Sequence, residues 1–170
     1  MSSINDLLAE IKNLTSNPKL AVSCPMNPMA IPGVDTAIYA AGDAFGTVFM
    51  VEVPKSGIIY SATFWDMDDE GLQTDFEIFR RAITTTANNA AWAPSDADIL
   101  NLVTELSFVS FDDHGNSRTS ELTNIGKAYS APDRKFWVQA ISRSTPTIAA
   151  SNLPYFQLQI LSDEIDYVER

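Results

Sequence analysis

The chain has 170 residues, 45% of them hydrophobic, and it carries 22 acidic against 11 basic side chains, for a formal net charge of −11. A chain of this length fits one domain with a short appendage. It buries about 70% of its unfolded surface, so its core does not need disulfides or metal ions for stability. The acidic surplus repels phosphate backbones, so nucleic acid is not an expected partner. Cys24 is the single cysteine, which excludes an intramolecular disulfide and is compatible with a reducing cytoplasm.

The sequence has no targeting or membrane signal. No basic run precedes an apolar stretch near residue 1. No window approaches the roughly 18 uninterrupted apolar residues of a membrane-spanning helix. We therefore expect neither secretion by a signal peptide nor a membrane partner.

The first 16 residues have the apolar spacing of an amphipathic helix that ends before Pro18. Such a stripe must be covered, either by the chain's own domain or by another subunit. As interface candidates it supplies Ile4, Leu7, Leu8, Ile11 and Leu14.

Residues 18–33 contain four prolines among apolar side chains, which prevents both a helix and a central strand. We expect an extended arm that lies along a surface of the same subunit or of a partner. Met26 and Met29 are its interface candidates.

The rest of the chain alternates as β-strands do. The first two strands flank Pro54–Gly57, which predicts a hairpin. The third strand, residues 74–80, is expected to bury the side chains of one face and to expose most of the other face to solvent. Residues 95–103 predict a short helix with Ser95 as its N-cap and Asp98 three positions later. The expected strands cover residues 47–53, 58–65, 74–80, 104–111, 136–143 and 155–161.

Short strands separated by turns favour an all-β, two-sheet antiparallel β-sandwich, jelly-roll-like, with a short N-terminal helix and a proline-rich extended arm. The expected division is 1–36 for the helix and arm and 37–170 for the sandwich. The inward positions of the alternation give the expected core: Val48, Met50, Ile59, Phe76, Ile78, Val138, Leu158 and Ile160.

An acidic segment that starts at Asp66 resembles the spacing of a calcium loop, with Asp68 and Glu70 at alternate positions, Gly71 in sixth place and Glu77 in twelfth. The helix–loop–helix frame is absent, and the flanks read as strands. We expect a solvated loop that gains little from calcium, and we expect no cofactor.

The sequence contains no recognisable arrangement of catalytic residues. His114 lies in a run of turn formers, and no nucleophile with an orienting partner accompanies it. The separation of carboxylates that a glycosidase needs is not contained in a sequence. We therefore expect a protein that is not an enzyme.

Aromatic side chains fill a core, form a subunit contact or line a carbohydrate groove. In the segment 136–138, either Trp137 faces outward or Phe136 and Val138 do, so Trp137 is an interface candidate. The residues considered for a sugar groove are Trp65, Trp92, Trp137, Tyr60, Tyr129 and Tyr155.

Several short motifs lie between residue 39 and about residue 163. They are Tyr39-Ala-Ala-Gly42-Asp43-Ala-Phe-Gly46, Pro54-x-x-Gly57-Ile58-Ile59-x-Ser61, the Asp66 that closes that strand, Phe76-Glu-Ile-Phe79, Ala91-Trp-Ala-Pro-Ser95-Asp96-Ala97-Asp98 and Phe156-Gln-Leu-Gln-Ile160. Together they resemble a family of small β-sandwich virion proteins of tailed bacteriophages.

The resemblance implies a structural component of the particle, in particular a capsid decoration protein that binds the assembled head. Its partners would be the major capsid protein or other virion proteins, in a homo-oligomer for which we expect a trimer. The protein would be made in the host cytoplasm and reside in the virion. The alternative is a carbohydrate-binding β-sandwich module of a phage tail or baseplate.

Overall fold

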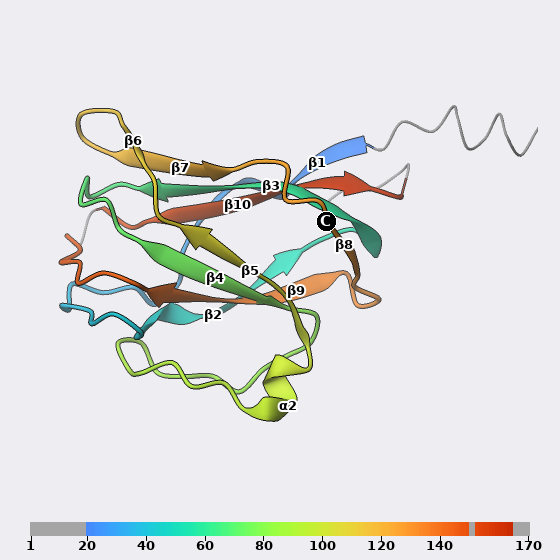
Figure 1. Cartoon of the computed structure of the whole chain (residues 1–170), viewed down its shortest axis with the longest axis horizontal. Helices are drawn as coiled ribbons and strands as arrows, with labels where there is room; N and C mark the ends of the chain where they lie inside the picture. Colours follow the sequence, from blue (N-terminus) through green and yellow to red (C-terminus); the bar gives the residue numbers. More distant parts are fainter. Residues whose placement is uncertain (1–19, 150–151, 165–170) are drawn as a thin grey trace, which may run out of the picture.

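The computed structural model describes residues 20–149 and 152–164, and this part of the chain forms two antiparallel sheets that face each other (Figure 1). The first sheet has the order β1 (Leu20–Ala30), β10 (Tyr155–Ser162), β3 (Ser56–Asp66), β7 (Arg118–Leu122) and β6 (Asp112–Asp113), and β8 (Lys127–Ser130) pairs with another stretch of β3. The second has the order β2 (Ala44–Glu52), β9 (Lys135–Ser142), β4 (Thr74–Phe79) and β5 (Leu102–Phe108). The expected all-β architecture of two antiparallel sheets is confirmed.

The segment between β2 and β3 crosses from one sheet to the other, so the hairpin expected around Pro54–Gly57 is wrong. The crossing is fixed by the connection between β8 and β9. The amide of Val53 donates to the carbonyl of Arg134 at 3.0 Å, and the amide of Ala131 donates to the carbonyl of Lys55 at 2.7 Å. Because the polar groups of the two connections bond to each other, β2 and β3 diverge instead of pairing.

The described part of the proline-rich segment is the edge strand β1. It pairs with β10 on both sides of an irregularity between Cys24 and Met29, and Pro25 and Pro28 fall inside that irregularity. Proline is tolerated there because its missing N–H removes no ladder bond. Cys24 and Ile31 are 0% and 1% exposed, so this segment belongs to the core of the sandwich instead of reaching away from it. The boundary expected at residue 36 therefore does not separate β1 from the sandwich.

The expected helix of residues 1–16 lies outside the described residues, and with it Ile4, Leu7, Leu8, Ile11 and Leu14.

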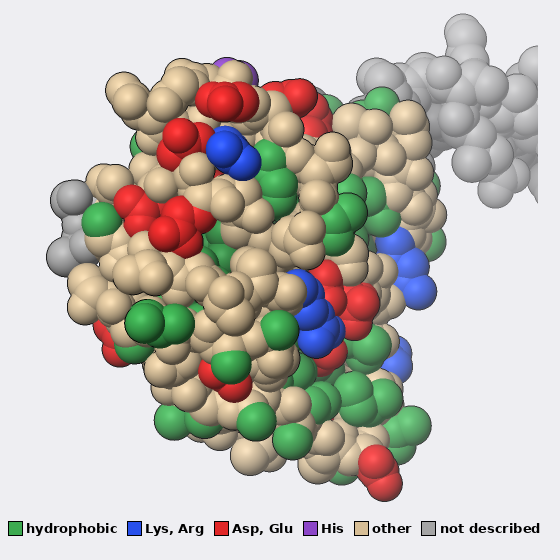
Figure 2. All heavy atoms as spheres, turned by 60° about the vertical axis from the view of Figure 1, so that its left-hand side comes forward, with side chains coloured by type: hydrophobic (Ala, Val, Ile, Leu, Met, Phe, Trp, Pro, Cys, Tyr) green, Lys and Arg blue, Asp and Glu red, His purple; other side chains and the backbone are tan. Residues whose placement is uncertain are grey.

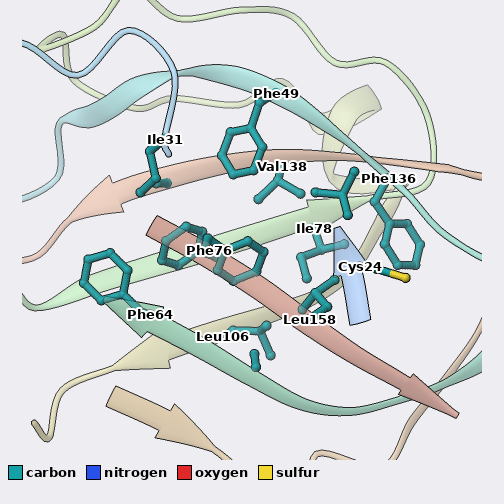
Figure 3. Packing of buried hydrophobic residues seen from close by; sticks show 14 of the residues in the cluster. Cys24, Ile31, Phe49, Phe64, Phe76, Ile78, Leu106, Phe136, Val138 and Leu158 are labelled. Carbon is teal, nitrogen blue, oxygen red and sulfur yellow. The ribbon is translucent and has the colours of Figure 1, made fainter. Parts of the chain in front are cut away.

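The core lies between the two sheets (Figure 3). Six of the eight expected core residues are fully buried at 0% exposure, namely Ile59, Phe76, Ile78, Val138, Leu158 and Ile160. The aromatic centre is Phe76, whose ring stacks on Phe156 at 4.3 Å and meets both Phe64 and Phe108 edge-on at 5.5 Å.

The assignment of Val48 and Met50 to the core is wrong. Val48 is half-buried and Met50 is 54% exposed, whereas Phe49 and Val51 are buried. The pairing of β2 with β9 shifts between Phe45 and Phe49, after Gly46 at φ +76°. Phe45, Phe49 and Val51 are buried and share one parity on both sides of this irregularity, so Val48 and Met50 lie on the outward face of the strand.

The outer face of the second sheet is partly covered by the connection between β4 and β5, which contains the short helix α2 (Asp96–Ile99) (Figure 1). The expected helix is confirmed with its capping box: Ser95 Oγ accepts from the amide of Asp98, and the Asp98 carboxylate accepts from that of Ser95. All six residues of β4 are buried, including Asp75 and Glu77, so the expectation of a wet face on this strand is wrong. The long connection supplies the cover that the alternation of one strand cannot reveal.

Candidate functional site

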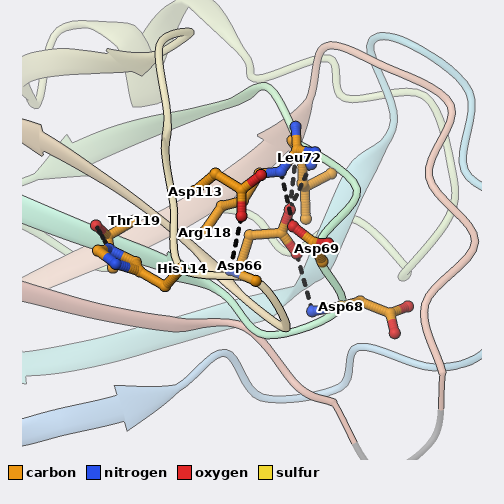
Figure 4. A network of polar contacts seen from close by, with 10 residues as sticks. Asp66, Asp68, Asp69, Leu72, Asp113, His114, Arg118 and Thr119 are labelled. Carbon is orange, nitrogen blue, oxygen red and sulfur yellow. Dashed lines mark hydrogen bonds and ion pairs between the residues drawn. The ribbon is translucent and has the colours of Figure 1, made fainter.

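The acidic loop after β3 is organised around a buried carboxylate (Figure 4). Asp66 is 1% exposed and accepts from three backbone amides: from Gly71 at 2.7 Å and Leu72 at 3.0 Å on Oδ2, and from Asp68 at 3.1 Å on Oδ1. The Asp66 carboxylate therefore holds the backbone of the following turn in place through these three amides. Gly71, at φ +69°, has the backbone conformation that favours glycine.

The other carboxylates of the loop fasten neighbouring segments. Asp68 accepts from the amide of Ala149 at 2.7 Å and from the side-chain amide of Asn152 at 2.9 Å. Glu70 accepts from the amide of Thr147 at 2.8 Å, and Asp69 pairs with Arg118 at 2.8 Å. The loop thereby joins the connection after β9 and the start of β7 to the end of β3. Figure 2 brings this end of the sandwich forward and shows several acidic but few basic side chains on it.

The structure does not bring Glu77 to these carboxylates. Asp66 ends β3 of the first sheet, and Glu77 lies in β4 of the second, where its carboxylate accepts from Trp92 Nε1 at 3.1 Å. Across residues 20–149 and 152–164, no group of three or more His, Cys, Asp or Glu side chains is placed to hold a metal ion. The twelfth position of the calcium-loop spacing thus falls on another sheet.

Glu77 is electrostatically unusual. Burial raises the pKa of its carboxyl above the ordinary 4.5, and the hydrogen bond from Trp92 counteracts this only in part. Its neighbour Asp75 accepts from Ser107 and pairs with Arg143. Glu77 thus fastens Trp92 of the covering connection, and Asp75 joins β4 to β5 and to the residue after β9.

His114 lies in the turn between β6 and β7. Its amide donates to the carbonyl of Ser117 at 2.9 Å, and its Nε2 lies 2.9 Å from Thr119 Oγ1 (Figure 4). The Asp113 carboxylate accepts a hydrogen bond from the amide of Gly115 at 2.7 Å. These contacts account for the run of turn formers without invoking a reaction.

The uncovered part of the second sheet is an apolar surface. Met50 on β2 lies directly opposite Trp137 on β9, and Trp137 lies opposite Phe79 on β4. Phe79 is buried under Trp92, at a ring distance of 6.5 Å, but Met50 is 54% exposed and Trp137 is half-buried. We call Val48, Met50 and Trp137 the Met50–Trp137 patch.

The outward side chain in the segment 136–138 is Trp137, because Phe136 and Val138 are both 0% exposed. Sequence reasoning missed Met50 as its neighbour. Glu52 was the available signal: it has the same parity as Val48 and Met50, and a carboxylate marks the wet face of a strand. The other interface candidates differ in exposure: Met26 is 62% exposed, whereas Met29 packs against the core.

The aromatic residues considered for a sugar groove do not form one group. Trp65 and Tyr155 are opposite partners on β3 and β10, both half-buried, and Tyr60 on β3 is 40% exposed. Trp137 belongs to the second sheet, and Trp92 lies in the connection between β4 and β5. Tyr129 is buried against Phe136 at a ring distance of 4.8 Å. The Trp65–Tyr155 pair is the one that joins two of these aromatic residues across adjacent strands.

No family model, no curated protein and no solved structure matches the chain. Over residues 20–149 and 152–164, no helix has the length and apolar character needed to cross a membrane.

Proposed function

We propose that this chain is a non-enzymatic structural protein of a bacteriophage virion, a capsid decoration protein that binds the assembled head. The observation that carries the proposal is the strand order, β1-β10-β3-β7 in one sheet and β2-β9-β4-β5 in the other. Successive strands change sheet except between β4 and β5 and among β6, β7 and β8, which is the connectivity of a jelly roll. Viral capsid domains use this architecture.

A fold alone does not fix a function, so the Met50–Trp137 patch is the second support. Exposed Met and half-buried Trp side chains are typical of the contact surfaces of assembling proteins. The symmetry of a shell multiplies each weak contact, so a small patch is sufficient for attachment. The major capsid protein is the proposed partner, and a homotrimer with a helix over residues 1–16 is the proposed form that docks.

The experiment is sedimentation of the purified chain with undecorated heads of the phage whose genome encodes it. Met50→Asp should weaken binding at least about tenfold, because it places a charge in an apolar contact. Val109→Asp is the matched control, since Val109 is 60% exposed but lies after β5, away from the patch. Equal binding by both variants would contradict the role of the patch, and no binding by the unaltered chain would contradict decoration.

A second candidate function is carbohydrate binding, on a tail or baseplate, and the Trp65–Tyr155 pair favours it. The two rings lie on neighbouring strands beside Thr119, the partner of Trp65 on β7. Aromatic faces next to hydroxyl groups are the usual composition of a sugar site. A glycan array with the unaltered chain, Trp65→Ala and the control Trp137→Ala tests this function. Glycan binding that is lost in Trp65→Ala and kept in Trp137→Ala supports a sugar site.

A further inference from the structure

Within the described part of the chain, the outer face of the first sheet is accessible to solvent. Phe156 and Leu158 of β10 are buried in the core, whereas Tyr155 and Gln157 are half-buried and lie on the opposite face. The pairing of β10 with β3 and of β3 with β7 continues this face across three strands. It is therefore a surface on which a ligand can lie across the strands.

Two rows of side chains cross this face. The first row consists of direct partners on β10, β3 and β7, namely Tyr155, Trp65 and Thr119. The second row lies about 7 Å further along the strands and consists of Gln157, Thr63 and Glu121. The two rows contain two aromatic side chains, two threonine hydroxyls, one amide and one carboxylate, but no lysine or arginine.

This combination suits the uncharged, hydroxyl-rich surface of a sugar, because aromatic faces stack on its rings and polar groups bond to its hydroxyls. Gln157 is held in a fixed position, since its Nε2 donates to the carbonyls of Pro25 at 2.9 Å and Met26 at 3.0 Å. Its Oε1 forms no hydrogen bond with the described residues, so it is available to accept one from a ligand. A group that is already ordered loses less entropy on binding.

Glu121 adds a selection by charge. Its side chain is exposed, and it forms no ion pair with the described residues. A carboxylate accepts strong hydrogen bonds from sugar hydroxyls, and it repels the carboxylate of a uronate or a sialic acid. The net charge of −11 acts in the same direction.

We propose that this face binds a neutral oligosaccharide, with Trp65 and Tyr155 stacking on its rings and Glu121 excluding acidic sugars. The inference rests on the second candidate function, carbohydrate binding, and it names the class of glycan and the residue that selects it. It does not depend on attachment to a head. The Met50–Trp137 patch belongs to the other sheet, so the two surfaces do not compete.

The probes are neutral linear hexasaccharides of glucose, mannose or galactose, each matched with the same sugar oxidised to the uronate at C6. Binding to the full chain is measured by isothermal titration calorimetry at low salt, where charge effects are largest. We expect at least one neutral sugar to bind at least about tenfold more tightly than its uronate. Glu121→Gln should reduce this ratio at least about threefold. Glu105→Gln is the matched control and should leave the ratio unchanged, because Glu105 is exposed on β5 of the other sheet.

Trp65→Ala verifies the place of binding, and far-UV circular dichroism verifies the folding of each variant. Binding that persists in Trp65→Ala would place the sugar elsewhere and overturn the proposal. Binding that depends on Trp65 but has equal affinity for neutral and oxidised sugars, or a ratio unchanged by Glu121→Gln, would overturn this inference and leave carbohydrate binding standing. No binding of any probe would contradict both.

Discussion

Replacing Asp66 by Asn is a sharp test of the acidic loop, because it preserves shape and removes charge. The carboxylate accepts from amides on both oxygens: Gly71 and Leu72 donate to Oδ2, and Asp68 donates to Oδ1. An Asn side chain has one acceptor oxygen, so its NH₂ group must face at least one backbone donor. A hydrogen bond to a charged group contributes about 1.5–3 kcal/mol, so we expect a loss of about 2–4 kcal/mol in the free energy of unfolding.

Urea unfolding followed by intrinsic fluorescence measures this change through the shift of the midpoint at constant slope. Asp69→Asn is the control, because the Asp69–Arg118 pair is about one-third exposed, at 34% for each side chain. An exposed pair contributes about 0–1 kcal/mol, so the control should change little. A loss below about 1 kcal/mol for Asp66→Asn, or equal losses for both variants, would refute the role assigned to the buried carboxylate.

Three further predictions concern the core, the pH dependence and calcium. Phe76→Ala should cost about 3–5 kcal/mol in urea unfolding, because its ring fills the centre of the core; a loss below about 1.5 kcal/mol would contradict this. The raised pKa of Glu77 means that its contribution to stability falls as pH rises from 4.5 through the raised value, so Glu77→Gln should gain stability relative to the unaltered chain between about pH 4 and pH 7. A constant difference between their urea midpoints over that range would refute the assignment. Millimolar calcium should change the melting temperature by less than about 1 °C, and a larger rise that Asp66→Ala abolishes would show a calcium site.

Sequence periodicity predicted most of the core because most strands keep a regular alternation. Phe76 and Ile78, for example, have the parity expected of them and are fully buried. It failed for Met50, because residues 48–51 are all apolar, so their own pattern does not show which alternate pair points inward. Glu52 carried the correct phase, as a charged residue on the outward face.

Long-range connections were less predictable for a different reason. Proline and glycine in Pro54–Gly57 indicate a turn, but they do not say whether the following strand pairs with its predecessor. That outcome depends on Ala131 and Arg134, which bond to the turn from about 80 residues away. The burial of Glu77 likewise depends on Trp92 in a long connection, so it could not be read from β4 alone.

The most direct test of the proposed function is the location of this chain in the phage particle. Cryo-electron microscopy of the virion, with the chain identified by fitting its two sheets and by loss of density when its gene is deleted, gives that location. Our account predicts ordered copies on the outer surface of the head, with the face that carries Met50 and Trp137 against the major capsid protein. Density at the tail or baseplate, or heads unchanged by the deletion, would contradict it.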